Sequence, residues 1–195
     1  MTGRALVVVD VQHDFCEGGS LAVAGGASVA AAIGELLRSD HGYDYVVATR
    51  DHHIDPGSHF SATPDFVDSW PPHCVVGTPG VEFRAELAQT DFEAVFDKGE
   101  YAAAYSGFEG RSGSGQTLAG WLSERSVQQV DVCGIATDYC VRATALDAAA
   151  EGFQTTVLLD RTAAVAPERI ADTLSALQDA GVILSGRTSA DEEAP

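Results

Sequence analysis

Four side chains that can bind a metal ion lie close together in this sequence. Asp51, His53 and His59 fall within one short stretch, and His73 follows the turn-forming run Trp70-Pro71-Pro72. A carboxylate with three neutral imidazoles is a ligand set that suits Zn, Fe, Mn or Ni. The alternative is a solvated loop that happens to be rich in histidine, since exposed loop histidines are common.

A second group of reactive side chains is spread along the chain. Asp10, Lys98 and Cys140 each stand at or just after the end of an apolar segment. Cys140 is a candidate nucleophile, because Thr137 or Asp138 is expected to cap a helix whose first turn holds the thiol. The positive end of that helix and a nearby ammonium group both favour the thiolate. Backbone N–H groups of the same turn can also hold an oxyanion.

Each member of this second group also has an ordinary explanation. A cysteine in a helix is usually a small buried apolar residue, an aspartate often forms a turn, and a lysine usually faces solvent. In the chemical explanation, Asp10 accepts the thiol proton and later donates one to a leaving amine, while Lys98 polarises the pair. Cys133 lies within an apolar segment and is expected to be inert, and Cys16 and Cys74 have no assigned role.

Short apolar segments alternate with helical patterns along most of the chain. Continuous β-branched runs indicate strands that are buried on both faces, as in a parallel sheet. These runs are 5–9, 45–49, 94–96, 130–135, 156–159 and 182–184. Apolar residues at helical spacing predict helices around 29–37, 118–122, 141–148 and 170–177. The order predicts an α/β fold, with a doubly wound, mostly parallel sheet of about six strands and helices on both faces.

This fold would bring the two groups of side chains together. In an open α/β sheet, ligands bind outside the carboxyl ends of the strands. Asp10, Asp51 and Lys98 end or follow three of the predicted strands, and Cys140 follows a fourth. The segment from Asp51 to Thr90 has little periodicity and holds five of the seven prolines. Long loops of this kind are usually functional, and a bound metal would order it, which favours the metal site over the histidine-rich loop.

Composition excludes several classes of partner. The chain has 195 residues and a formal net charge of −18, so nucleic acid and anionic membranes are not expected to bind. Its length fits a single domain, predicted over 1–189, with a disordered acidic tail over 190–195. The four cysteines show no disulfide framework, and the first apolar run is too short for a signal peptide. A cytoplasmic protein, either a monomer or a homo-oligomer, is therefore expected.

Several longer motifs resemble the nicotinamidase/pyrazinamidase branch of the isochorismatase-like hydrolases, and the similarity spans nearly the whole chain. The motifs are Val9-Asp10-Val11-Gln12-His13-Asp14-Phe15-Cys16-Glu17-Gly18-Gly19-Ser20-Leu21, Asp51-x-His53 with His59, Trp70-Pro71-Pro72-His73-Cys74, Lys98-Gly99, Tyr105-Ser106-Gly107-Phe108-Glu109-Gly110 and Gly134-Ile135-Ala136-Thr137-Asp138-Tyr139-Cys140-Val141. The metal set separates this branch from relatives that lack it.

The resemblance implies a reaction and a role for individual residues. The reaction is hydrolysis of nicotinamide to nicotinate and ammonia, and of pyrazinamide to pyrazinoate, through a thioester on the cysteine. The implied catalytic residues are Asp10, Lys98 and Cys140; the implied ligands of one divalent Zn, Fe or Mn ion are Asp51, His53, His59 and His73; the implied substrate contacts are Phe15, Leu21, Trp70, Tyr105 and Tyr139; and the implied oxyanion hole is the backbone of Ala136 and Cys140, beside a cis peptide between Ile135 and Ala136.

One residue departs from the family pattern, and three other functions stay open. Tyr139 stands where closely related enzymes often carry histidine, so contacts with the substrate ring are expected to differ. His52 lies between two candidate ligands, but strand-like alternation points it away from them. The rival functions are a metallohydrolase with a passive Cys140, a metal-dependent binding protein without turnover, and a related hydrolase of another small amide or vinyl ether.

Overall fold

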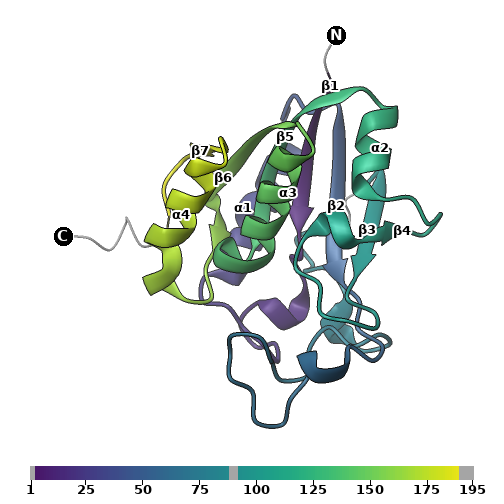
Figure 1. Cartoon of the computed structure of the whole chain (residues 1–195), viewed down its shortest axis with the longest axis vertical. Helices are drawn as coiled ribbons and strands as arrows, with labels where there is room; N and C mark the ends of the chain where they lie inside the picture. The colour runs from purple at the N-terminus through teal and green to yellow at the C-terminus, as the bar shows by residue number, and fades with distance from the viewer. Residues whose placement is uncertain (1–2, 88–91, 189–195) are drawn as a thin grey trace.

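The computed structural model describes residues 3–87 and 92–188, and its centre is one twisted sheet (Figure 1). Within these residues the sheet has seven strands in the order β4-β3-β2-β1-β5-β6-β7. All neighbouring strands are parallel except β3 and β4. The strands are β1 (Gly3–Val9), β2 (Tyr45–Asp51), β3 (Ala94–Lys98), β4 (Arg111–Ser112), β5 (Val127–Ile135), β6 (Gln154–Ala163) and β7 (Ile183–Ser185).

The central strands are apolar throughout because both of their faces are covered. In β1, Ala5, Val7 and Val9 pack into one hydrophobic cluster, while Leu6 and Val8 pack into another on the opposite face. This alternation is the usual consequence of strand geometry. A continuous apolar run therefore predicts a doubly covered strand, and the structure confirms the mostly parallel α/β sheet.

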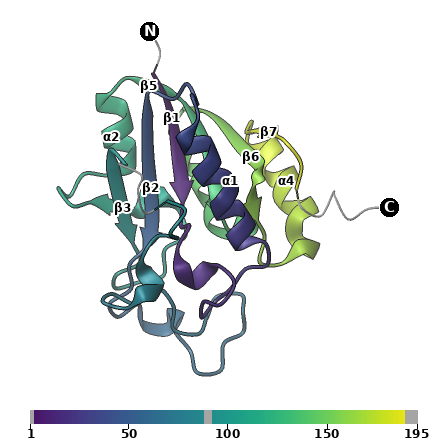
Figure 2. The ribbon, with the colours of Figure 1, turned by 180° about the vertical axis from the view of Figure 1, so that it is seen from behind.

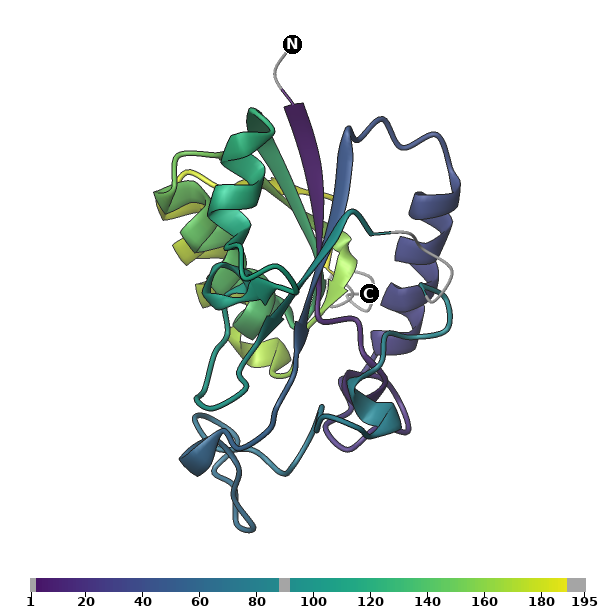
Figure 3. The ribbon, with the colours of Figure 1, turned by 90° about the vertical axis from the view of Figure 1, so that its right-hand side faces the viewer.

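Four α-helices of the described residues cover the two faces. They are α1 (Gly26–Arg38), α2 (Leu118–Glu124), α3 (Arg142–Ala150) and α4 (Ile170–Asp179). Figure 3 shows the sheet edge-on, with α1 on one side and the other three helices on the other side, and Figure 2 shows α1 in front of the sheet. Each helix lies where apolar spacing predicts one. Thr117 caps α2, since its side chain accepts a hydrogen bond from the N–H of Gly120.

The carboxyl ends of β1, β2, β3 and β5 meet at one edge of the sheet. Asp51 pairs in register with Lys98, and Val9 pairs with both Thr49 and Gly134. The long connection from β2 to β3 leaves this edge at the bottom of Figure 1. Its described part contains two short 3₁₀ turns, Gly57–His59 and Pro79–Val81, and single β-bridges that include His53 with Val75. The connection is thus irregular but folded back on itself.

Over residues 3–87 and 92–188 the structure has one strand that the sequence pattern did not predict. It is β4, a two-residue antiparallel strand at the sheet edge. The predicted acidic tail, 190–195, lies outside the described residues, so its disorder stays a prediction. In the described part of the chain, no helix combines the length and the apolar character needed to cross a bilayer.

Candidate active site

Lys98 is the centre of a buried charge cluster at the carboxyl edge of the sheet. Its ammonium group forms ion pairs with Asp10, at 2.9 Å, and with Asp51. The same group lies 3.6 Å from the sulfur of Cys140. All four residues are buried. The structure therefore brings together the three residues predicted to carry the chemistry, and it joins them to a predicted metal ligand through one lysine.

The charges of this cluster depend on one another. Burial opposes the charged form of Lys98, but its two carboxylate partners raise the pKa of the ammonium well above its usual value. Burial also opposes ionisation of Asp51, but Lys98 and the neighbouring histidines hold its pKa well below the usual range. For Asp10 burial prevails over Lys98, and the pKa of this carboxyl is raised. Asp10 is thus the carboxylate more ready to take up a proton.

The state and setting of Cys140 differ from the sequence-based prediction in two ways. Cys140 lies in a π-helical turn, Thr137–Val141, whose N-cap is Ala136 and lacks a side-chain cap, so the expected cap by Thr137 or Asp138 is wrong. Burial, only partly opposed by Lys98 and reinforced by Asp10, also raises the pKa of the Cys140 thiol, although the helix end and the ammonium group were expected to favour the thiolate. A thiol with a raised pKa needs a base beside it to act as a nucleophile.

Two polar residues position this cluster: Thr49, to which the sequence analysis gave no role, and Asp138, which was predicted only as a possible helix cap. Thr49 donates a hydrogen bond from Oγ1 to Oδ1 of Asp10 at 2.7 Å. Asp138, next but one to the nucleophile candidate, accepts hydrogen bonds from the N–H groups of Val165 and Ala166 at 2.9 and 3.0 Å. Thr49 fixes the orientation of the Asp10 carboxyl group, and Asp138 ties the turn that holds Cys140 to the segment after β6.

The four predicted metal ligands form a compact buried cluster. One nitrogen from each of His53, His59 and His73 lies within 4.8 Å of the other two. Oδ2 of Asp51 lies 3.5 Å from Nε2 of His53 and 3.8 Å from Nε2 of His73. His52, as expected, lies outside the cluster, and its ring contacts Glu100 at 3.2 Å.

The hydrogen bonds around these rings suit a metal ion. Nδ1 of His53 lies 2.6 Å from the carbonyl of Gly99, and Nδ1 of His73 lies 2.8 Å from the carbonyl of Pro71. A carbonyl only accepts, so each Nδ1 carries the proton and each Nε2 presents a lone pair. Within the described residues, Nε2 of His53 and Nδ1 of His59 are buried without a hydrogen-bond partner. Such orphaned acceptors, beside a carboxylate, fit a divalent transition metal.

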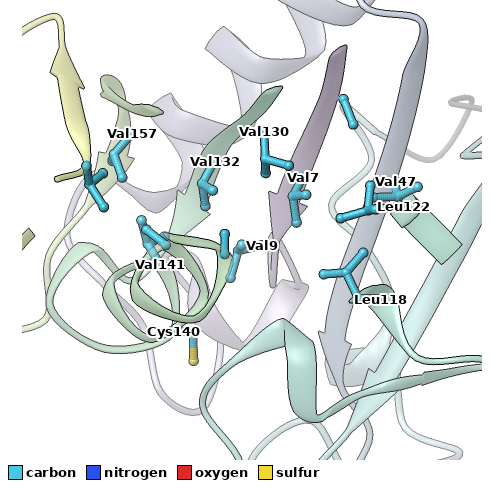
Figure 4. Packing of buried hydrophobic residues seen from close by; sticks show 14 of the residues in the cluster. Val7, Val9, Val47, Leu118, Leu122, Val130, Val132, Cys140, Val141 and Val157 are labelled. Atoms are coloured by element: carbon cyan, nitrogen blue, oxygen red, sulfur yellow. The ribbon is translucent and has the colours of Figure 1, made fainter. Parts of the chain in front are cut away.

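A pocket with about 400 Å³ of empty space, part of it open to solvent, is lined by residues of both clusters. All five predicted substrate contacts line it, and so do Asp51, His59, His73, Ala136 and Cys140. Figure 4 shows Cys140 at the rim of the hydrophobic cluster, with its sulfur pointing away from the valines of the sheet. The peptide bond between Ile135 and Ala136 is cis, as predicted. Val23, Ile135 and Val165 complete the wall, and sequence analysis assigned them no role there.

The cysteines separate into one pocket residue and three others. All four are free and buried. Cys133 belongs to the hydrophobic cluster on the α1 face, where burial raises the pKa of its thiol far above the usual value. Cys16 lies in the same cluster, and burial raises the pKa of its thiol to about 11. Cys140 is the cysteine that combines a pocket surface with a neighbouring carboxylate.

Comparison with known proteins agrees with this geometry. The family model of the isochorismatase domain matches residues 4–189. The chain is 56% identical to the nicotinamidase/pyrazinamidase of Mycobacterium tuberculosis, over 93% of this chain and 97% of that protein. It is 35% identical to the nicotinamidase of Escherichia coli, over 94% and 95% of the two chains.

Solved structures show the same likeness. A protein of L. infantum, solved in complex with nicotinate, superposes with a TM-score of 0.83 and 36% identity over 97% of this chain and 94% of that one. A pyrazinamidase of Pyrococcus horikoshii in complex with zinc gives a TM-score of 0.80 and 37% identity over 94% and 99%. With its sheet, its buried charge cluster and its match from residue 4 to residue 189, this chain belongs to the isochorismatase domain family.

Proposed function

We propose that this protein is an amidase that hydrolyses nicotinamide to nicotinate and ammonia, and pyrazinamide to pyrazinoate, through a thioester on Cys140. One observation carries the proposal: Lys98 joins the carboxyl group of Asp10, the sulfur of Cys140 and the metal-ligand candidate Asp51 in a single buried cluster beneath the pocket. The two relatives reported above match most of this chain, and their names support nicotinamide and pyrazinamide as the substrates.

The first half of the reaction forms the thioester. Asp10 accepts the proton of the Cys140 thiol: the raised pKa of the thiol makes a neighbouring base necessary, and the raised pKa of Asp10 makes this carboxylate a stronger base. The sulfur attacks the amide carbon, and the backbone N–H groups of Ala136 and Cys140 stabilise the oxyanion that develops. Asp10 then returns the proton to the amide nitrogen, the C–N bond breaks, and ammonia leaves.

The second half releases the acid. A water molecule that has replaced ammonia loses a proton to Asp10 and attacks the thioester carbon. The C–S bond breaks, the sulfur regains a proton, and the carboxylic acid product departs. Lys98 stays cationic throughout, because its two carboxylate partners hold its pKa well above the usual value. Its fixed charge keeps Asp10 and the sulfur in place while their protons move.

Asp51, His53, His59 and His73 would hold one divalent transition metal ion, whose identity among Zn, Fe and Mn stays a prediction. When bound, this ion supplies a Lewis-acidic contact for a ring nitrogen of the substrate. The zinc complex of the Pyrococcus horikoshii pyrazinamidase supports such an ion. Phe15 and Trp70, on the pocket wall, would hold the aromatic ring by its faces.

Ammonia release from nicotinamide by the metal-loaded protein tests the proposal. Stoichiometric nicotinate and ammonia are expected, whereas a binding protein without turnover would release neither. A hydrolase of a different small amide would show its best kcat/KM on another member of an amide panel. A metallohydrolase with a passive cysteine would keep its activity after alkylation of Cys140. The cytoplasmic location, the absence of nucleic-acid and membrane partners, and the oligomeric state stay predictions.

A further inference from the structure

Tyr139 stands at the mouth of the pocket, directly before Cys140 in the chain. Its ring lines the pocket and is half-buried, whereas Cys140 is buried. The ring meets Trp70 edge-on, with centroids 5.1 Å apart and planes at 86°, and lies 5.9 Å from the ring of Tyr105. Edge-to-face contacts of this kind fix the orientation of a ring. The phenol of Tyr139 is therefore part of an ordered aromatic rim.

The hydroxyl group of Tyr139 joins two segments that lie far apart in sequence. It accepts a hydrogen bond from Nη1 of Arg169 at 2.5 Å and donates one to the carbonyl oxygen of Phe66 at 3.4 Å. The guanidinium of Arg169 also lies 4.7 Å from the centroid of the Tyr139 ring. This cation–π contact adds to the hydrogen bond. One side chain thus bridges the long β2–β3 connection and the start of α4.

Each bridged segment is held in place by its own hydrogen bonds. On one side, Oδ1 of Asp65 accepts from the N–H groups of Val67, Asp68 and Ser69, which makes a tight turn around Phe66. The ring of Phe66 meets Trp70 edge-on at 6.2 Å. The turn therefore presents its carbonyl oxygen to Tyr139 from a preorganised position.

On the other side, Arg169 ends a 3₁₀ turn, Pro167–Arg169. The preceding residues, Val165 and Ala166, donate their N–H groups to the carboxylate of Asp138. Asp138 and Tyr139 are consecutive residues, so two neighbouring side chains of one turn both bind the segment from Val165 to Arg169. The backbone that carries Arg169 is therefore fixed in place, although the Arg169 side chain itself is exposed.

We propose that Tyr139 is a specificity-determining residue that closes the mouth of the pocket and limits the substrates to small aromatic amides without further ring substituents, and that Arg169 is the positioning residue that holds it there. The inference rests on the proposed function and adds a size limit to it. In the proposed reaction the substrate ring lies between Phe15 and Trp70 with its amide at Cys140, so part of its remaining edge would face Tyr139, which lines the same pocket. A group added at that edge would then meet the Tyr139 ring.

The size limit is tested with nicotinamide and its three derivatives that carry a methyl group on ring carbon 4, 5 or 6. The measured quantity is kcat/KM of each derivative relative to nicotinamide. One methyl group in a tight pocket changes this ratio by about tenfold or more. In Tyr139→Ala we expect at least one derivative to gain that factor, and in Tyr139→Phe, which keeps the ring, we expect a gain below about threefold.

A ratio that is the same in Tyr139→Ala and in the wild-type enzyme for all three derivatives would overturn the size limit. If Tyr139→Ala does not fold, Tyr139→His replaces it, and the smaller ring is expected to give a gain between those of the Ala and Phe variants. A wild-type enzyme that releases no ammonia from nicotinamide contradicts the proposed function instead. In that case calorimetric Kd values for the same four compounds and variants decide the size limit.

The positioning role of Arg169 has a separate test. Arg169→Ala and Tyr139→Phe both break the same hydrogen bond, so each is expected to raise KM for nicotinamide several-fold while kcat changes little. The double variant should then raise KM no further than the larger single effect, because coupled residues are not additive. Arg38→Ala, at an exposed position on α1, is the matched control and should leave KM unchanged. Additive increases of KM in the double variant, or a fall in kcat without a change in KM, would show that Arg169 does not position Tyr139.

Discussion

Replacing the buried Lys98 by methionine should lower the free energy of unfolding far more than replacing Arg50, whose ion pair with Asp97 is partly exposed. At an effective dielectric constant of about 20, the attraction across the 2.9 Å between Lys98 and Asp10 is roughly 6 kcal/mol. Desolvation of the buried groups offsets much of this attraction, yet removal of one partner leaves two carboxylates buried without a cation. Such a removal costs about 3–5 kcal/mol.

For a chain of this length, that cost lowers Tm by roughly 6–20 °C. The assay is thermal and guanidinium unfolding of Lys98→Met at pH 7 with a chelator present, so that metal affinity does not enter the comparison. Arg50→Met is the control. Arg50 pairs with Asp97 at 2.5 Å, but both side chains remain about one-quarter exposed, at 23% and 26%, and a pair of that kind contributes about 1 kcal/mol or less.

The two variants together make the outcome decisive. If the free energy of unfolding of Lys98→Met lies within about 1 kcal/mol of that of the wild-type protein, the two carboxylates do not depend on this cation. The description of the buried charge cluster would then be wrong. Equal losses in both variants would show that burial adds nothing to the ion pair. Adding Asp10→Asn to Lys98→Met should recover part of the lost stability, because it removes one of the uncompensated charges.

Three further predictions concern the metal, the thiol and the substrate. His53→Ala, His59→Ala and His73→Ala should each lose bound metal and raise KM, and elemental analysis that finds full metal in two of them would refute the ligand set. Alkylation of Cys140 by iodoacetamide in the free enzyme should keep accelerating from pH 6 to about pH 9, since a raised pKa leaves little thiolate at neutral pH; a rate that levels off near pH 7 would contradict the raised pKa. Benzamide, which lacks the ring nitrogen, should be a much poorer substrate than nicotinamide when the metal is bound, and chelation should shrink that difference; equal rates with the metal-loaded enzyme would show that the metal does not select the substrate.

Local patterns in the sequence were enough to predict the fold. The apolar runs of β1, β2 and β5 are continuous because each strand is covered on both faces, and helices fall between them at the predicted places. The two residues of β4 were missed because a strand so short leaves no periodicity to read. Its pairing with β3 is a tertiary contact.

The candidate site was predicted as far as residue types and strand ends allow. Asp10, Asp51 and Lys98 meet because parallel strands end at a common edge. The capping prediction failed because Asp138 binds the backbone of Val165 and Ala166, which lie far along the chain and which no local pattern connects to it. The direction of the pKa shift of Cys140 was also mispredicted, because burial outweighs the nearby ammonium and the depth of burial appears only in the packed structure.

The kcat of Cys140→Ala for nicotinamide, set beside that of Cys133→Ala, tests the proposed covalent mechanism most directly. Both substitutions remove a buried thiol, but Cys133 packs on the opposite face of the sheet, away from the pocket. The account predicts that Cys140→Ala loses roughly 10⁴-fold or more in kcat while it still binds nicotinamide and metal, and that Cys133→Ala keeps its rate at some cost in stability. A Cys140→Ala enzyme that retains more than about one-tenth of the wild-type kcat would show that the thiol is not the nucleophile.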